Sequence, residues 1–147
     1  MSEPRSAALE VHGISVAIDG HTILGDVSVS VHAGEVLALV GPNGAVKSTL
    51  LGVISGDIEP AEGRVCLHGR PLTDYSAREA ARERAVLLQE QRLAFGFRGR
   101  EVVEMGRTPW YRTPQEERDE VAVAEAMERT DVVEFADRLF PSLSGGE

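Results

Sequence analysis

The residues with the clearest chemical potential lie in one short stretch, Gly41 to Thr49, which reads Gly-Pro-Asn-Gly-Ala-Val-Lys-Ser-Thr. A glycine-rich turn ending in Lys-Ser, between an apolar run and a helix, lets backbone N–H groups and the lysine surround a polyphosphate while a hydroxyl ligates Mg²⁺. Glycine usually precedes that lysine, and here the position is Val46. The stretch therefore predicts a phosphate-binding loop with one altered residue.

Two further motifs follow the loop in a fixed order. Gln89 comes directly after the apolar run Ala85–Leu88, and the chain closes on Leu143-Ser144-Gly145-Gly146-Glu147. Serine and glycine together are more often a plain cap or turn. The order of loop, glutamine and Leu-Ser-Gly-Gly-Glu is what favours a functional interpretation.

The elements before the loop read as strands. Leu9–Ile18 and Ile23–Val31 are rich in valine and isoleucine, and Asp19-Gly20 between them is a favoured hairpin turn. After the turn at Ala33-Gly34, Glu35–Val40 is a nearly continuous apolar run, which predicts a strand buried on both faces that delivers the loop.

A helix is expected after the loop, from Lys47 to Ser55, with Leu50, Leu51 and Ile54 on its buried side and Gly56 at its end.

Shorter elements follow. Arg64–His68 predicts a strand, Ser76 and Glu79 have the spacing of a capping box for a helix reaching about Arg84, and Ala85–Leu88 predicts a brief strand. A helical turn or two is expected over Glu101–Gly106.

The last part of the chain reads as helical. Thr113 to Glu116 has the spacing of a second capping box, with Pro114 at the first helical position, so an acidic helix should begin there. Val123, Ala126 and Met127 at helical spacing predict its core face.

Composition sets wider bounds. The chain has 147 residues, 42% of them apolar, which suits one globular domain. We expect neither a membrane span nor a signal peptide, and we interpret the single cysteine, Cys66, as a small buried side chain. A formal charge of −9 argues against nucleic acid as a partner. The four histidines predict solvated or capping roles rather than metal ligands.

Taken together, the three motifs resemble the ATP-binding cassette of ABC transporters, from Leu9 to Glu147. The resemblance implies an α/β phosphate-loop NTPase with an N-terminal antiparallel β subdomain, a RecA-like core and a helical subdomain. On this pattern residues 1–147 are a partial nucleotide-binding domain, with about 1–89 forming the β subdomain and loop core and about 90–147 the glutamine loop and helical subdomain.

Within that family, three local stretches look most like the ATPases of bacterial haem importers. The resemblance thus implies an ATP-hydrolysing subunit that drives haem (hemin) import across the cytoplasmic membrane. Iron-siderophore or cobalamin import is an alternative within the same branch, and a soluble phosphate-loop kinase is a distant one. The stretches are Arg84–Gln89, Leu93–Phe95, and Glu101–Val103 together with Gly106–Pro109.

The resemblance also implies a role for each motif. Lys47 and Gln89 would be catalytic, and Ser48 and Gln89 would hold Mg²⁺ beside ATP. Leu143, Ser144, Gly145, Gly146 and Glu147 match the signature motif, which binds the ATP of an opposite subunit. The loop residues expected to contact ATP are Gly41, Pro42, Asn43, Gly44, Ala45, Val46, Lys47, Ser48 and Thr49.

Partners follow from the same resemblance. They are a second copy of the ATPase in a homodimer, a transmembrane permease and, indirectly, a periplasmic or lipoprotein binding protein. The subunit would lie peripherally on the cytoplasmic face of the cell membrane.

The sequence departs from the family pattern in three places. Val46 is expected to need a positive φ, at a cost of roughly 1–2 kcal/mol, and to weaken ATP binding. The pattern also expects an apolar strand ending in Asp-Glu and a later histidine, and the sequence stops at Glu147 before either. Ile18 stands where many cassettes stack the adenine on an aromatic ring. The competing hypothesis belongs to another functional class: a non-catalytic truncated fragment with weak or no nucleotide binding.

Overall fold

The computed structural model describes residues 7–41, 45–87 and 96–144. Contacts divide the chain into two compact units, Met1–Glu83 and Arg84–Glu147. The boundary expected from sequence, between residues 89 and 90, lies outside the described residues. Each unit is described by itself below.

A long antiparallel hairpin organises the first unit. β1 (Ala7–Ile18) pairs with β2 (His21–His32), and the two-residue turn between them has positive φ at both Asp19 and Gly20. That geometry suits the right-handed twist of a hairpin, so the predicted turn is confirmed. β3 (Glu62–Leu67) pairs with the other edge of β1, and β4 (Arg70–Pro71) pairs with β3, so the sheet order is β2-β1-β3-β4.

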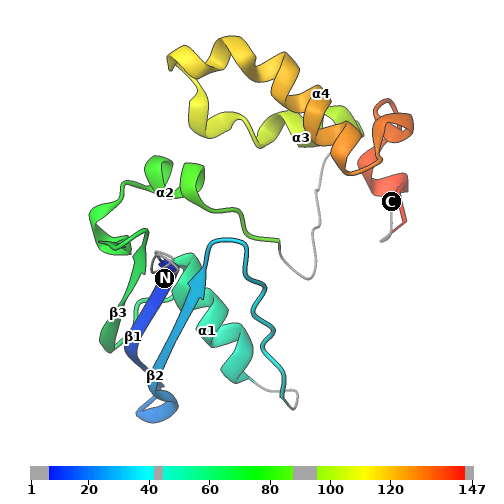
Figure 1. Ribbon diagram of the computed structural model, residues 1–147. Helices are drawn as coiled ribbons and strands as arrows, with labels where there is room; N and C mark the ends of the chain where they lie inside the picture. The colour runs from blue at the N-terminus through cyan, green and yellow to red at the C-terminus, as the bar shows by residue number, and fades with distance from the viewer. Residues whose placement is uncertain (1–6, 42–44, 88–95, 145–147) are drawn as a thin grey trace. The chain divides into compact units, whose positions relative to one another are not determined.

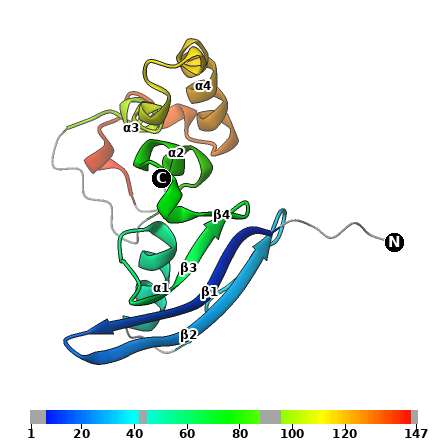
Figure 2. The same ribbon diagram turned by 90° about the vertical axis from the view of Figure 1, so that its left-hand side faces the viewer.

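One helix, α1 (Ala45–Ser55), packs on this sheet (Figures 1 and 2). Leu50 and Val53 are its buried apolar side chains, whereas Leu51, expected on the same face, is more than half exposed. Residues three apart share a helix face, and the next residue along turns away from it by about 100°. The core cluster comprises Val11, Ile14, Val16, Leu24, Leu50, Val53 and Val65.

A bulge bends the sheet near its middle. Gly13 has a φ of +58°, and its N–H donates to the Ser28 hydroxyl at 2.9 Å where the ladder is interrupted. Gly63 on β3 has a φ of +86° and lies so close that a Cβ there would overlap the carbonyl oxygens of His12 and Gly13. Glycine is thus required at position 63 both by conformation and by space.

The unit closes with α2 (Ala77–Glu83). The Ser76 hydroxyl accepts the Glu79 N–H at 3.3 Å, and a Glu79 carboxylate oxygen accepts the Ser76 N–H at 2.8 Å, so the predicted capping box is confirmed. The Ser76 hydroxyl also donates to this carboxylate at 2.7 Å. This hydrogen bond, the one from the Ser76 N–H and the nearby Arg70 guanidinium lower the pKa of Glu79. Cys66 is buried, as expected.

The predicted strand at Glu35–Val40 is not formed. These residues have no regular secondary structure, and Val36 and Val40 are 94% and 93% exposed. The apolar run Ala85–Leu88 was predicted as a strand too, but residues 85–87 have no regular structure and Leu87 is exposed. A strand exists only through pairing, and the described residues supply neither run with a neighbouring strand.

Two packed helices form the second unit, α3 (Gly99–Met105) and α4 (Asp119–Arg129). Val123 and Met127 are buried as expected, and Ala126 is exposed. Arg100 on α3 makes ion pairs with Glu104 at 2.8 Å and Glu120 at 2.6 Å, which raise the pKa of the guanidinium. Short 3₁₀ turns join and follow the helices, at Thr108–Trp110, Pro114–Arg118, Val133–Phe135 and Phe140–Ser142.

The second capping box was predicted wrongly. The Thr113 hydroxyl donates to the Trp110 carbonyl at 2.6 Å, and the Glu116 carboxylate accepts the Arg112 N–H at 2.8 Å. Pro114 begins a 3₁₀ turn instead, and the α-helix starts five residues later, at Asp119.

Replacing Gly63 with alanine should destabilise the first unit more than replacing Gly69. Gly69 also has a positive φ, +77°, but a Cβ there would meet open space. We expect Gly69→Ala to lower the free energy of unfolding by roughly 1–2 kcal/mol. Gly63→Ala should lower it by about 3 kcal/mol or more, since the overlap with backbone adds to the strain. Urea unfolding of both variants measures the difference, and equal losses would contradict the close approach.

The exposed run Glu35–Val40 should make the chain associate. Placing lysine at Val36 and Val40 removes most of the exposed apolar surface there without touching the core, so concentration-dependent association should fall. Sedimentation at several concentrations measures the effect. Val133→Lys, at an exposed valine of the second unit, is the control and should change association little.

Candidate functional site

The N-terminal turn of α1 carries the described part of the predicted phosphate loop. Leu50 and Val53 fix the helix on the sheet, so its first residues project from the unit. Gly41 is exposed, while Pro42, Asn43 and Gly44 lie outside the described residues, as does the side chain of Ala45. The site is therefore described from Gly41 and from Val46 to Thr49.

Lys47 already reaches back across the loop. Its ammonium donates to the Gly41 carbonyl at 2.7 Å, a span of six residues. Lys47 is also the only lysine in the sequence. The interaction places a positive charge beside the positive end of the α1 dipole, the combination that attracts a phosphate.

The two hydroxyls after Lys47 differ in exposure. Ser48 is exposed, whereas Thr49 is 5% exposed and belongs to the buried residues of the unit. Ser48 is therefore the hydroxyl of the two that solvent reaches, and its role as a magnesium ligand stays a prediction. No cluster of three or more histidine, cysteine or acidic side chains suited to a metal occurs among the described residues.

Val46 is not strained. It lies in the first turn of α1 and is absent from the described non-glycine residues with positive φ. The expected conformational cost was therefore wrong, because a helical backbone accepts valine with only a small loss of side-chain freedom. The Val46 side chain is 53% exposed and directly precedes Lys47, so we expect any effect of it on a ligand to be steric.

The remaining predicted residues belong to the second unit or to its undescribed parts. Gln89 lies outside the described residues, and so do Gly145, Gly146 and Glu147. Leu143 follows the 3₁₀ turn Phe140–Ser142, and Ser144 is exposed.

Hydrogen bonds join the two ends of the second unit. The Phe140 N–H donates to the Phe97 carbonyl at 2.8 Å, and Arg98 forms an isolated bridge with Leu139. The residues shortly after Gln89 in sequence are thus tied to those that lead into Leu143. Sequence reasoning missed this link because no local pattern predicts a single bridge.

Arg107 is a further structural centre that the sequence did not reveal. Its guanidinium pairs with the Asp119 carboxylate at 2.6 Å and lies 4.2 Å from the centre of the Trp110 ring. Arg107 thereby joins the loop after α3 to the start of α4.

Comparison with protein families decides the identity of the fold. A family model described as ABC transporter matches residues 24–147. The chain belongs to the ABC transporter family.

Two curated relatives of this ABC transporter chain share a name. A hemin import ATP-binding protein HmuV from Streptomyces coelicolor is 56% identical over 135 residues, 92% of this chain and 48% of the relative. One from Rhodococcus jostii is 53% identical over 142 residues, 97% of this chain and 49% of the relative. The chain therefore spans about half the length of these relatives.

Solved ABC transporter structures confirm the predicted fold class. CbiO1 from Clostridium perfringens, part of an ABC transporter complex, matches 95% of this chain and 56% of its own, with a TM-score of 0.76 and 26% identity. A nucleotide-free ATP-binding cassette matches 95% and 60%, with a TM-score of 0.77 and 25% identity. Among the described helices of this family member, none is both long enough and apolar enough to span a membrane.

Replacing Val46 with glycine should strengthen ATP binding. Removing the isopropyl group lets phosphate oxygens approach the first amides of α1, and we expect an affinity gain of about tenfold, equivalent to roughly 1.4 kcal/mol. Calorimetric titration of ATP into both proteins measures it. The matched control is Val121→Gly, because Val121 is also helical and 53% exposed. Equal ATP affinities of the unaltered chain and the Val46→Gly variant would show that the side chain does not obstruct the ligand.

Proposed function

We propose that this protein is the ATP-binding subunit of an ABC importer and couples ATP hydrolysis to hemin import across the cytoplasmic membrane. The observation that carries the proposal is the Lys47 ammonium held 2.7 Å from the Gly41 carbonyl, at the exposed N-terminal turn of α1, within a chain of this family. The hemin assignment is supported by the names of the curated relatives.

Phosphate binding would exchange one partner of Lys47 for another. The ammonium now donates to a neutral carbonyl, and a triphosphate oxygen offers a negatively charged acceptor instead. The helix dipole acts in the same direction. Lys47 would hold the β- and γ-phosphates and offset the charge that develops during phosphoryl transfer.

Magnesium fits the donors that the site offers. Mg²⁺ is usually held by one or two protein oxygens together with substrate phosphates, and the exposed Ser48 hydroxyl is such an oxygen. Gln89 is proposed as the second. When bound, the ion would neutralise charge on the phosphates, and Lys47 and Ser48 would orient the phosphate oxygens.

Hydrolysis and transport would require partners. We propose a homodimer in which the segment Leu143–Glu147 of one copy faces the nucleotide of the other, bound to a permease at the cytoplasmic face of the membrane. A binding protein outside the membrane would deliver the cargo to the permease. Iron-siderophore or cobalamin import is the alternative cargo.

Two observations support the second candidate function, a non-catalytic chain. The Val46 side chain stands beside Lys47 at the phosphate end of α1, and the apolar run Glu35–Val40 is exposed. A chain of this kind would bind nucleotide weakly and hydrolyse none.

Replacing Lys47 with alanine tests the proposed site. Removing a charged hydrogen-bond donor should weaken ATP binding by about 1.5–3 kcal/mol, or roughly 10- to 150-fold. Arg78→Ala, which removes an exposed cation from α2, is the control and should leave affinity within about twofold. Lys47 is the only lysine, so its side-chain amine can be followed with an acylating reagent. Bound ATP should protect this amine from the reagent, which gives a second measurement. Unchanged affinity and no protection would overturn the site.

The cargo needs a separate test. The importer would be reconstituted in vesicles with its permease and binding protein, and ATP hydrolysis measured with hemin, an iron siderophore or cobalamin. Stimulation by hemin alone is the expected result. Stimulation by another cargo would replace hemin in the proposal and leave the ATPase role intact.

A further inference from the structure

Lys47 is the one side chain in the sequence with which an activated acyl group can form a stable amide. Of the 15 lysine and arginine residues, 14 are arginines, and a guanidinium that stays protonated is not a nucleophile. The single thiol, Cys66, is buried. An acyl donor that reaches this chain therefore has Lys47 as its lasting side-chain target.

The Lys47 amine is held where an anion is expected to bind. Its Nζ lies 2.7 Å from the Gly41 carbonyl oxygen, and the side chain is partly exposed. This hydrogen bond folds the side chain back toward the start of the loop. Lys47 also lies in the first turn of α1, where N–H groups without an intrahelical partner attract negative charge. A small phosphorylated molecule bound at this turn would have its phosphate beside the amine.

An acyl phosphate carries a phosphate and a reactive carbonyl in one small molecule. Its carbonyl carbon is bonded directly to a phosphate oxygen, so a site that holds the phosphate also holds the carbonyl. Holding two reacting groups side by side accelerates their reaction relative to free collision. Lys47 should thus react with an acyl phosphate faster than its amine alone would predict.

We propose that Lys47 is a modification site, acylated by small acyl phosphates that bind through their phosphate at the first turn of α1. The inference rests on the proposed nucleotide binding and adds a regulation of the same site. The ammonium gives one proton to water, the nitrogen lone pair attacks the carbonyl carbon, and the carbon–oxygen bond to the phosphate breaks. Inorganic phosphate leaves with the electron pair of that bond and takes the second amine proton, so a neutral amide remains.

The amide changes what the site can bind. It carries no positive charge and cannot offset the charge of a triphosphate, so acylation should weaken ATP binding. Bound ATP should in turn exclude the acyl phosphate, because both use the same amine. Acylation would therefore be confined to chains that hold no nucleotide.

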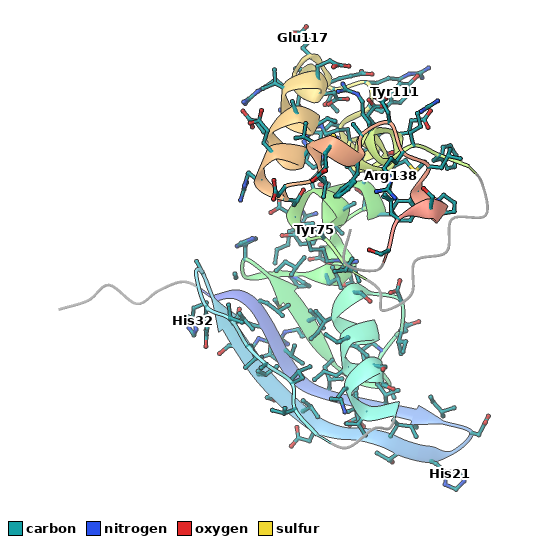
Figure 3. The ribbon with its side chains drawn as sticks, turned by 90° about the vertical axis from the view of Figure 1, so that its right-hand side faces the viewer. His21, His32, Tyr75, Tyr111, Glu117 and Arg138 are labelled. Atoms are coloured by element: carbon teal, nitrogen blue, oxygen red, sulfur yellow. The ribbon has the colours of Figure 1, made fainter. Side chains whose placement is uncertain are left out.

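Arg78→Lys supplies a matched control within the same molecule. Arg78 is exposed and, like Lys47, lies in the first turn of a helix. The start of α2 is already capped, because the Ser76 hydroxyl accepts the Glu79 N–H, and the Glu79 carboxylate repels an anion there. Figure 3 shows α2 beside Tyr75, at the opposite end of the first unit from the start of α1, and Figure 1 shows the same separation.

The experiment treats the Arg78→Lys variant with acetyl phosphate and, separately, with N-hydroxysuccinimide acetate, an acylating ester without a phosphate. Peptide mass mapping gives the acetylation rate at each lysine and separates both from the α-amino group. We expect the ratio of the rate at Lys47 to the rate at the introduced lysine to be about tenfold higher or more with acetyl phosphate. ATP should slow the reaction at Lys47 alone.

A second measurement follows the consequence for the nucleotide. The unaltered chain, once acetylated at Lys47, should bind ATP roughly 10- to 150-fold more weakly in a calorimetric titration, as expected for the loss of a charged donor. The same rate ratio with both reagents, or acetylation of Lys47 by acetyl phosphate that ATP does not slow, would overturn the inference.

Titration of ATP into the untreated chain separates that failure from failure of the proposed function. If ATP binds and the two reagents give the same rate ratio, the nucleotide site stands and only the modification is refuted. If ATP does not bind, the proposed nucleotide site is refuted, and this inference with it.

Discussion

The packing of α1 on the antiparallel sheet is the interaction on which the rest of the site depends. Leu50 and Val53 contribute one buried face to the core around Ile14 and Val16. Once that face is fixed, the helical repeat sets the direction of every residue in the first turn. Thr49 is buried, while Val46 and Ser48 are exposed. The arrangement of groups around a phosphate is thus a consequence of burying apolar side chains one turn away.

The sheet that carries α1 has a bulge at Gly13, and a bulge bends its strand. An interrupted ladder would leave backbone donors unsatisfied, and two serines prevent this. The Ser28 hydroxyl accepts the Gly13 N–H, and the Ser15 hydroxyl accepts the Asp26 N–H at 3.1 Å. The close approach of Gly63 holds β3 against the bulge. The hairpin therefore continues past the bend as a paired ladder up to Ile18 and His21.

In the second unit, distant parts of the sequence are held together by backbone hydrogen bonds rather than by a large core. The Gly99 N–H donates to the Arg138 carbonyl and the Arg100 N–H to the Ala136 carbonyl, both at 3.0 Å. These hydrogen bonds hold the segment that follows position 95 next to the segment preceding Leu143.

Local rules in the sequence determined those features whose partners are close along the chain. The Asp19-Gly20 turn, the capping box of Ser76 and Glu79, and the helix after the phosphate loop each depend on residues within a few positions, and each was predicted. The motif order also predicted the family and the fold class.

Tertiary structure decided what depends on a distant neighbour. Glu35–Val40 has the composition of a buried strand, but a strand forms only against another strand, and the sequence cannot say whether one is present. Leu51 is apolar enough for the core, but its position around the helix turns it away from the face that carries Leu50 and Val53. Val46 looked strained until the start of α1 at Ala45 gave it a helical backbone. Composition records what a segment can bury, whereas pairing and packing decide what it does bury.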